Sequence, residues 1–125
     1  MKTTVTKILS FDAAHCLPEH EGKCRNVHGH TYTLEVTVEG QVQDGGPTDR
    51  MVMDFADLRG RVAELVVDHL DHQYLNDLFD FVPTAEALAA WAFEELRASG
   101  LPVVRVRLWE TPTSYADVTT EGSAT

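Results

Sequence analysis

The sequence has no hydrophobic run long enough to cross a membrane or to form the core of a signal peptide. Basic residues are also scarce, since ten lysines and arginines stand against twenty aspartates and glutamates, giving a formal net charge of -10. Proteins that bind nucleic acids usually carry a basic face, so this balance argues against such a partner. We therefore expect a cytoplasmic protein that binds neither membranes nor nucleic acids.

Cysteine is rare too, with only Cys16 and Cys24 among 125 residues. In a reducing compartment, two such cysteines are expected to remain thiols rather than to form a disulfide. There is no internal repeat and no low-complexity segment. The length suits one domain with its own core and is short for two. We expect a single domain over residues 1–120 and a flexible tail at 121–125.

Periodicity of the apolar residues predicts the elements of this domain. Strands are expected at 3–15, 30–39, 103–110 and 114–119, where apolar and polar side chains alternate, and a short strand at 51–53. Helical spacing predicts one helix capped by Asp54 that continues to Val66, and another that begins at Thr84 and stops at Gly100. The simplest packing is an α+β fold, an antiparallel sheet with both helices on one face.

Three histidines stand out because they fall on two neighbouring predicted strands. His28 and His30 are two residues apart, so they project from the same face of a strand, and His15 ends the strand before. Three protein ligands leave one tetrahedral position open, which is typical of catalytic rather than structural zinc. We expect His15, His28 and His30 to bind Zn²⁺, and we interpret His20 and His69 as ordinary polar side chains.

Cys24, four residues before His28, has three possible roles on this reasoning. It is an inert packed thiol, a fourth ligand that closes the zinc site, or a reactive thiol beside an electropositive ion. The second role would make the chain a noncatalytic zinc-binding module, and only the third requires an open metal position.

Two further positions carry candidate chemistry. Asp71 and His72 are adjacent just beyond the first helix, and an imidazole with a carboxylate beside it can move protons, although such neighbours are common in loops. Glu110 follows a strand whose alternation places it on the side of the apolar residues Val104, Val106 and Leu108. An inward carboxylate needs partners, and a heterocycle with adjacent N–H donors would supply them.

Five short motifs then occur together in one order. They are Phe11-Asp12-Ala13-Ala14-His15, the segment from Cys24 to His30, Leu70-Asp71-His72 with Tyr74-Leu75-Asn76, Pro83-Thr84-Ala85-Glu86, and Trp109-Glu110-Thr111. With these motifs the chain resembles the family of 6-pyruvoyltetrahydropterin and 6-carboxytetrahydropterin synthases over nearly its whole length. The three-residue gap between Cys24 and His28 resembles the bacterial carboxytetrahydropterin branch.

The resemblance implies the tunnelling fold (T-fold), in which a four-stranded antiparallel sheet with two helices on one face assembles into a β-barrel. It implies a homo-hexamer, a dimer of trimers with active sites between subunits. The implied substrate is 7,8-dihydroneopterin triphosphate, and the implied products are 6-carboxytetrahydropterin and acetaldehyde, on the way to 7-deazapurines such as the queuosine precursor. A pyruvoyl or hydroxymethyl product of a related pterin enzyme is the main alternative.

The resemblance also implies residue roles. By analogy the three histidines hold zinc, Cys24 is the catalytic thiol, Asp71 and His72 assist proton transfer, and Glu110 anchors the pterin ring. Thr84 and Glu86 lie where the family contacts substrate, although Val82 stands where the family often has asparagine. Lys23 and Arg25 are the basic residues nearest the zinc motif, and they either meet the triphosphate or are simply solvated.

Overall fold

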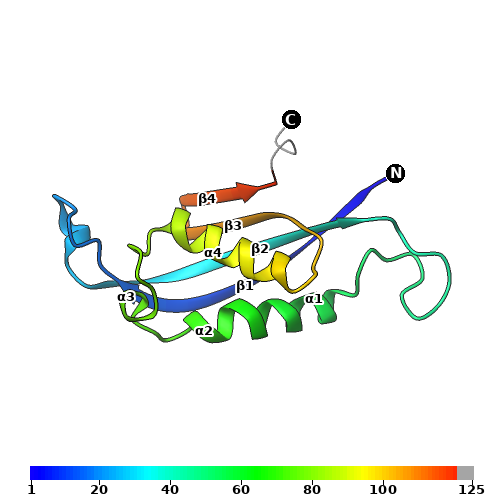
Figure 1. Cartoon of the computed structure of the whole chain (residues 1–125), viewed down its shortest axis with the longest axis horizontal. Coiled ribbons are helices and arrows are strands. Elements are labelled where there is room, and N and C mark those ends of the chain that lie inside the picture. Colours follow the sequence, from blue (N-terminus) through cyan, green and yellow to red (C-terminus); the bar gives the residue numbers. More distant parts are fainter. Residues whose placement is uncertain (121–125) are drawn as a thin grey trace.

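A computed structural model describes residues 1–120, and the tail expected at 121–125 lies outside the described residues. The centre of the fold is one antiparallel sheet of four strands in the order β1-β2-β3-β4 (Figure 1). The strands are β1 (Thr3–His15), β2 (His28–Gly40), β3 (Val103–Thr111) and β4 (Ser114–Thr119). The four long predicted strands and the antiparallel sheet are thus confirmed.

One face of the sheet forms the hydrophobic core. Leu9 of β1 pairs with Leu34 of β2, which pairs in turn with Leu108 of β3, and all three side chains are buried. Alternation along each strand brings their neighbours two residues away to the same face. The helices cover this face, and they form one core cluster with the strands.

The helices begin where the sequence predicts them. The carboxylate of Asp54 accepts from the amide of Ala56 at 2.7 Å, and the hydroxyl of Thr84 accepts from the amide of Ala87 at 3.1 Å, so both residues are N-caps. The helical elements are η1 (Lys23–Arg25), α1 (Phe55–Val62), η2 (Ala63–Val67), α2 (Asp68–Leu70), α3 (Leu75–Leu78) and α4 (Ala85–Ala98). The first helix is therefore not regular, because η2 between α1 and α2 is π-helical. The short elements η1 and α3 were not expected.

The strand expected at 51–53 is wrong, because these residues have no strand conformation. The loop closes on itself instead. The amide of Gln43 donates to the carbonyl oxygen of Met51 at 2.9 Å, and the amide of Arg50 donates back to Gln43 at 2.8 Å. These hydrogen bonds hold the backbone before Val52 within the loop, so the segment does not join the sheet.

The face expected for Val104 also needs correction. Thr37 pairs with Arg105, but Val38 pairs with Val103, so Val104 is the extra residue of a β-bulge. As a result Val103 is fully buried, whereas Val104 is only partly buried. The alternation resumes after the bulge, where Val106 and Leu108 are buried as expected.

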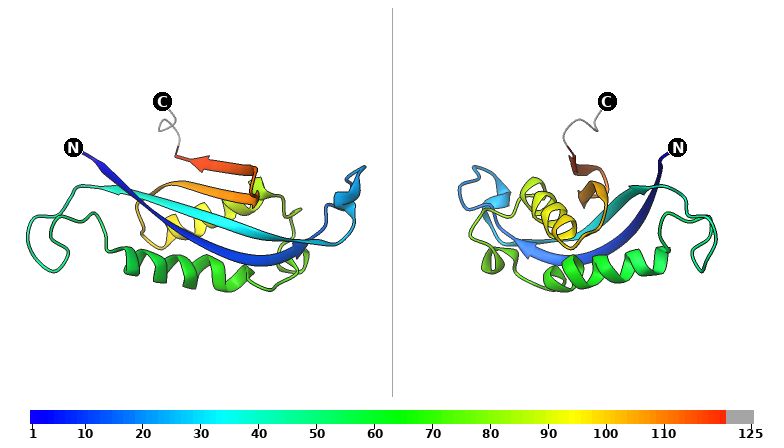
Figure 2. Two further views of the ribbon diagram at one scale, coloured as in Figure 1. Left: turned by 180° about the vertical axis from the view of Figure 1, so that it is seen from behind. Right: turned by 45° about the vertical axis from the view of Figure 1, so that its right-hand side comes forward.

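The two ends of the long curved strands carry different loops (Figure 2). The loop between β1 and β2 contains η1 and projects beyond one end of the sheet, and the loop between β2 and α1 lies at the other end (Figure 1). Within residues 1–120, no helix combines the length and the apolar character needed to span a membrane. The end that carries η1 is also the end at which the predicted site residues lie.

Candidate active site

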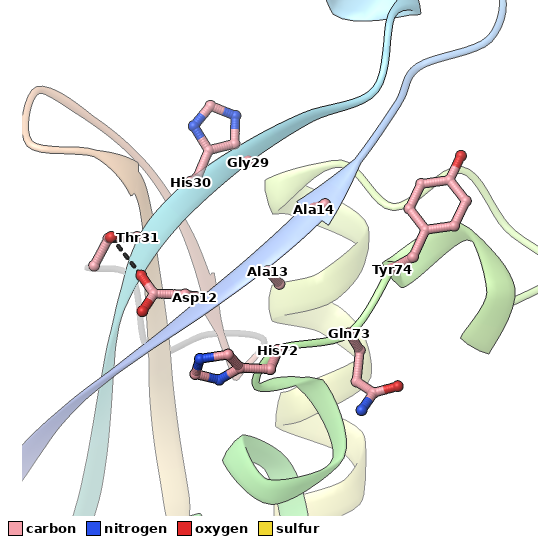
Figure 3. A pocket seen from close by; sticks show the side chains of 9 residues that line it. All are labelled: Asp12, Ala13, Ala14, Gly29, His30, Thr31, His72, Gln73 and Tyr74. Carbon is pink, nitrogen blue, oxygen red and sulfur yellow. Dashed lines mark hydrogen bonds between the residues drawn. The ribbon is translucent and has the colours of Figure 1, made fainter.

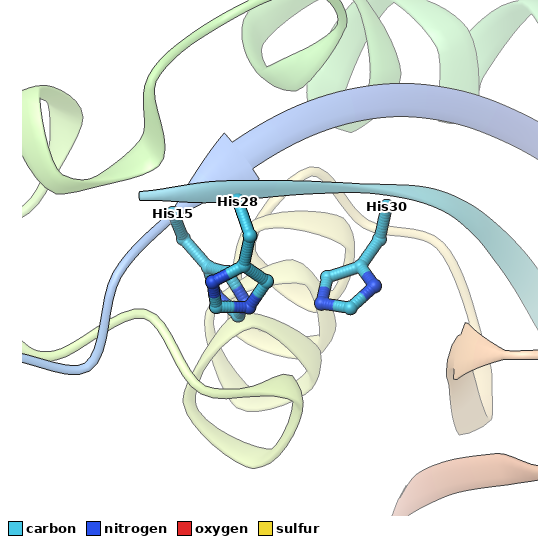
Figure 4. Close-up of side chains that lie close together, drawn as sticks. All are labelled: His15, His28 and His30. Atoms are coloured by element: carbon cyan, nitrogen blue, oxygen red, sulfur yellow. The ribbon is translucent and has the colours of Figure 1, made fainter. Parts of the chain in front are cut away.

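The three predicted histidine ligands come together at the end of the β1-β2 pair. His15 lies directly opposite His28 in the register, and His30 lies opposite Ala13, so all three rings point to the same side of the sheet (Figure 4). Their ring centroids are 4.6 to 5.1 Å apart. One possible ligand atom from each ring lies within 4.8 Å of the other two. The sequence therefore predicted this cluster correctly.

Backbone carbonyls orient two of the rings. Nδ1 of His15 donates to the carbonyl oxygen of Pro83 at 2.8 Å, and Nδ1 of His28 donates to that of Asn26 at 2.7 Å. A carbonyl oxygen can only accept, so in each neutral ring the proton is on Nδ1 and Nε2 carries a free lone pair. This is the arrangement by which proteins fix metal-binding histidines.

The Nε2 atoms of all three histidines are buried and have no hydrogen-bond partner within residues 1–120. Three buried ring nitrogens without hydrogen-bond partners would be costly in an ordinary core. A divalent cation that prefers imidazole nitrogen would satisfy them together, and three histidines would leave it one open position. The residues present thus fit a catalytic zinc ion.

Glu110 borders this cluster. Its Oε1 lies 3.3 Å from Nε2 of His30, and the carboxylate is half-buried, as the sequence predicted for an inward side chain. Burial lowers the pKa of His30; Glu110 opposes this shift, and His15 and His28 add to it. His30 is therefore neutral around pH 7, the form that binds metals. Burial, with a further contribution from Glu110, raises the pKa of Tyr32, so its phenol stays protonated.

Asp71 and His72 lie together beside the edge of β1 that does not pair with β2. Oδ1 of Asp71 is 3.0 Å from Nδ1 of His72 and also accepts from the amide of Asp12 at 3.0 Å. The Asp12 amide, and then His72, lower the pKa of the Asp71 carboxyl below its usual value. His72 has a φ of 61°, in the left-handed region, and its own amide donates to the carbonyl oxygen of Asp12 at 2.6 Å. The backbone of β1 thus holds the pair in place.

Sequence reasoning missed two residues beside this pair. Asp12 and Thr31 are opposite each other in the register, and the hydroxyl of Thr31 donates to the carboxylate of Asp12. Together with His72 they border a pocket of about 550 Å³ (Figure 3). Because side chains alternate, Asp12 projects from the face opposite to His15, three residues further on. The same alternation that located the histidines could have located Asp12.

Known proteins give this geometry a context. Residues 4–121 match the family described as 6-pyruvoyl tetrahydropterin synthase. The chain belongs to this family. A 6-carboxy-5,6,7,8-tetrahydropterin synthase from Synechocystis sp. is 46% identical over 115 residues, covering 90% of this chain and 89% of the relative.

Two further family members differ in their named activities. A dihydroneopterin monophosphate aldolase from Pyrococcus furiosus is 40% identical, covering 88% of this chain and 91% of the aldolase. The solved structure of 6-pyruvoyl tetrahydropterin synthase from Caenorhabditis elegans is 32% identical with a TM-score of 0.82, and 96% of each chain is covered. One fold in this family thus carries relatives named for different pterin reactions.

Several of the family motifs form hydrogen bonds that stabilise the local structure of this chain. The side-chain amide of Asn76 accepts from the amide of Cys16 at 2.9 Å and donates to its carbonyl oxygen at 3.0 Å, so it fastens the end of β1. The Cys16 thiol lies 3.2 Å from the hydroxyl of Tyr74. Thr84 caps α4, and the preceding Pro83 supplies the carbonyl that orients His15. The Pro-Thr motif is therefore tied directly to the metal-binding cluster.

The remaining predicted residues are placed as follows. Glu86 is exposed and lines a pocket of about 380 Å³ together with Glu110. Cys24 is partly buried on η1, and its thiol does not belong to the group of ligand atoms within 4.8 Å of one another. Among the described residues of one chain, the possible ligand atoms of the three histidines and those of Asp71 and His72 form separate groups, and Cys24 belongs to neither. His30 and His72 nevertheless both line the pocket of about 550 Å³.

Proposed function

We propose that the protein is a zinc-dependent 6-carboxytetrahydropterin synthase. It converts 7,8-dihydroneopterin triphosphate and water to 6-carboxy-5,6,7,8-tetrahydropterin, acetaldehyde and triphosphate. The observation that carries the proposal is the set of three buried Nε2 atoms that have no hydrogen-bond partner among residues 1–120, in a chain that is 46% identical to a relative of that name. The pathway would be the synthesis of 7-deazapurines of the queuosine type, in the cytoplasm.

His15, His28 and His30 would hold the ion. Zinc, when bound there, supplies a Lewis acid that makes the side-chain hydroxyls of the substrate more acidic. The carbonyls of Pro83 and Asn26 keep two of the rings turned so that Nε2 faces the centre of the cluster. Retention of full activity by metal-free protein would contradict this assignment.

Of the other site residues, some bind the pterin ring and the rest transfer protons. The two oxygens of the Glu110 carboxylate accept from adjacent N–H donors of the pterin ring, and Thr84 and Glu86 border the ring. The Cys24 thiolate removes a proton from the side-chain carbon of the substrate. The carboxylate of Asp71 orients His72, whose imidazole transfers protons during the redox rearrangement that precedes loss of triphosphate.

We further propose that each site lies between subunits of a homo-hexamer whose sheets form a barrel. Cys24 and the metal ligands come from one subunit, and Asp71 with His72 come from its neighbour. The separation of their ligand atoms within one chain supports this division, because Asp12, which contacts the pair, projects from the face of β1 opposite to His15. A second subunit would bring the missing groups to each pocket.

The decisive experiment is product analysis with 7,8-dihydroneopterin triphosphate. Mass spectrometry should identify 6-carboxytetrahydropterin, with acetaldehyde released in equal amount. A pyruvoyl product alone would assign the protein to the other branch of the family. A hydroxymethyl product is the second alternative, favoured by the relative named as a dihydroneopterin monophosphate aldolase.

A noncatalytic zinc module is less well supported. A closed site would need a fourth protein ligand, and the Cys24 thiol lies outside the group formed by the three histidines. X-ray absorption spectroscopy of the zinc protein without substrate provides the test, because a Zn–S bond would favour the closed site.

A further inference from the structure

The ten basic side chains of this acidic protein differ in whether they have hydrogen-bond or ion-pair partners. Five of them have hydrogen-bond or ion-pair partners, namely Lys2, Arg61, Arg97, Arg105 and Arg107. Among residues 1–120 the side chains of the other five have none, namely Lys7, Lys23, Arg25, Arg50 and Arg59. Of these, only Lys23 and Arg25 lie close together in the sequence, and they flank Cys24 on η1.

Hydrogen bonds fix the position of η1 relative to the histidine cluster. The amide of Leu17, just after β1, donates to the carbonyl oxygen of Cys24 at 2.7 Å, and the amide of Asn26 donates to that of Lys23 at 3.1 Å. The carbonyl oxygen of Asn26 in turn accepts from the ring of His28 at 2.7 Å. The turn that carries both cations is therefore connected to a metal-binding side chain through a single residue.

The reach from these cations to the cluster is short. Arg25 precedes His28 by three residues, and three residues span at most about 11 Å even when fully extended. Both cationic side chains are exposed, and both are long enough to extend several ångströms further. A phosphate ester on the side chain of a pterin held at the histidine cluster would lie within their range.

The overall charge makes such a local site necessary. A triphosphate ester carries several negative charges, and a chain with a formal net charge of -10 repels it at a distance. Glu19 and Glu21 lie in the same loop, but neither forms an ion pair within 4.0 Å with Lys23 or Arg25 among the described residues. The two cations are therefore available to an anionic ligand.

We propose that Lys23 and Arg25 bind the triphosphate of the substrate and set the preference for a triphosphate over a monophosphate ester. The inference rests on the proposed function. The family contains a relative named for a dihydroneopterin monophosphate, so the number of phosphates is a property in which its members differ. Arg25 provides a planar fork suited to phosphate oxygens, and Lys23 a compact charge.

The test compares three variants, Lys23→Gln, Arg25→Gln and the double change, with the control variant Arg59→Gln. Arg59 lies on α1, and its side chain has no hydrogen-bond or ion-pair partner among the described residues. For the triphosphate substrate, each single change should raise KM about tenfold and the double change about a hundredfold, with kcat within about twofold. The value of kcat/KM should also lose much of its dependence on salt. Arg59→Gln should match the parent protein, and Lys23→Arg should retain most binding.

A second measurement uses inorganic triphosphate alone as the probe. Calorimetry should show that inorganic triphosphate binds to the parent protein and to Arg59→Gln. The double variant should lose affinity for it by about the same factor as its KM rises. An unchanged KM and unchanged triphosphate binding in the double variant would overturn the proposal, as would a fall in kcat accompanied by loss of zinc. If the parent protein does not turn over the pterin substrate, the proposed function fails, and calorimetry alone decides whether the anion site exists.

Discussion

The histidine cluster and the pair Asp71 and His72 use the same strand, β1, in different ways. The cluster lies on the core-facing side, where burial and two backbone carbonyls fix the rings. In the pair, His72 is exposed and Asp71 is partly exposed, and the backbone of Asp12 holds both from the strand edge. Burial and the backbone carbonyls thus hold one set of side chains around a common centre, whereas the other set stays accessible to solvent or to a second subunit.

The largest effect on activity is expected from a substitution in the buried histidine cluster. His28→Ala should lose zinc and reduce turnover by at least about a thousandfold, because two histidines cannot hold the ion firmly. Metal analysis and steady-state kinetics provide the measurement. His69→Ala, which changes an exposed histidine of α2, is the control and should retain both zinc and activity.

Cys24→Ala should separate metal binding from chemistry. We expect full zinc content with turnover lowered about a thousandfold, since the proposed base is removed and the histidines are untouched. The matched control is Cys16→Ala, which removes a thiol that contacts Tyr74 and should retain most activity. Loss of zinc from Cys24→Ala would instead assign the thiol as a ligand.

The division of the site between subunits can be tested by mixing two inactive proteins. Cys24→Ala and His72→Ala should each be inactive, but after reversible dissociation and reassembly some interfaces would combine an intact Cys24 with an intact His72. Activity should reappear only in the mixture. Native mass spectrometry must show mixed oligomers; if these form from folded subunits and remain inactive, the shared site is wrong.

Glu110 lies against the histidine cluster, and its replacement should affect binding more than the metal. Glu110→Gln should weaken pterin affinity about tenfold to a hundredfold, because glutamine replaces one of the two acceptor oxygens with an NH2 donor. Zinc content and the melting temperature should be unchanged. Glu64→Gln, an exposed substitution in η2, serves as the control, and equal pterin affinity in both variants would exclude Glu110 from ring recognition.

The smallest effect concerns the exposed pair. The folded state lowers the pKa of Asp71 below 3.8, so the ionised carboxylate contributes stability above that pH, and the contribution is lost as the pH falls through the lowered pKa. Asp71→Asn should therefore lower the melting temperature slightly near pH 7, and this difference should shrink below about pH 4. Asp44→Asn, in an exposed loop, should show no such trend.

The sequence predicted most of what depends on side-chain periodicity. The ends of β1 and β4, the caps Asp54 and Thr84, and the meeting of three histidines all follow from alternation, helical spacing or capping chemistry. The resemblance to the family correctly predicted the four-stranded sheet with helices on one face. These features are local, or they follow from pairing two neighbouring strands.

Features that depend on backbone hydrogen bonds between distant segments were not predictable. No side-chain pattern shows that the carbonyl of Pro83 orients His15, or that the amide of Asp12 holds Asp71, because every residue carries a backbone carbonyl and all but proline carry an N–H. The expected strand at 51–53 failed for a related reason, since the loop around Gln43 uses those backbone groups itself. The bulge at Val104 likewise left no signal in a run of similar apolar residues.

The π-helical stretch η2 determines where Asp71 and His72 lie. In η2 the amide of Asp68 reaches back five residues to the carbonyl oxygen of Ala63, so this turn holds one more residue than a regular helical turn. Because the wider turn absorbs this residue, the helix after η2 keeps the phase of a regular helix, with Leu70 in the core and the amide of His72 against Asp12. Deleting one residue from η2 should therefore restore regular winding and leave that phase unchanged. In the regular helix α4, the same deletion would rotate every following residue by about 100° around the helix axis. A one-residue deletion should thus be tolerated better in η2 than in α4.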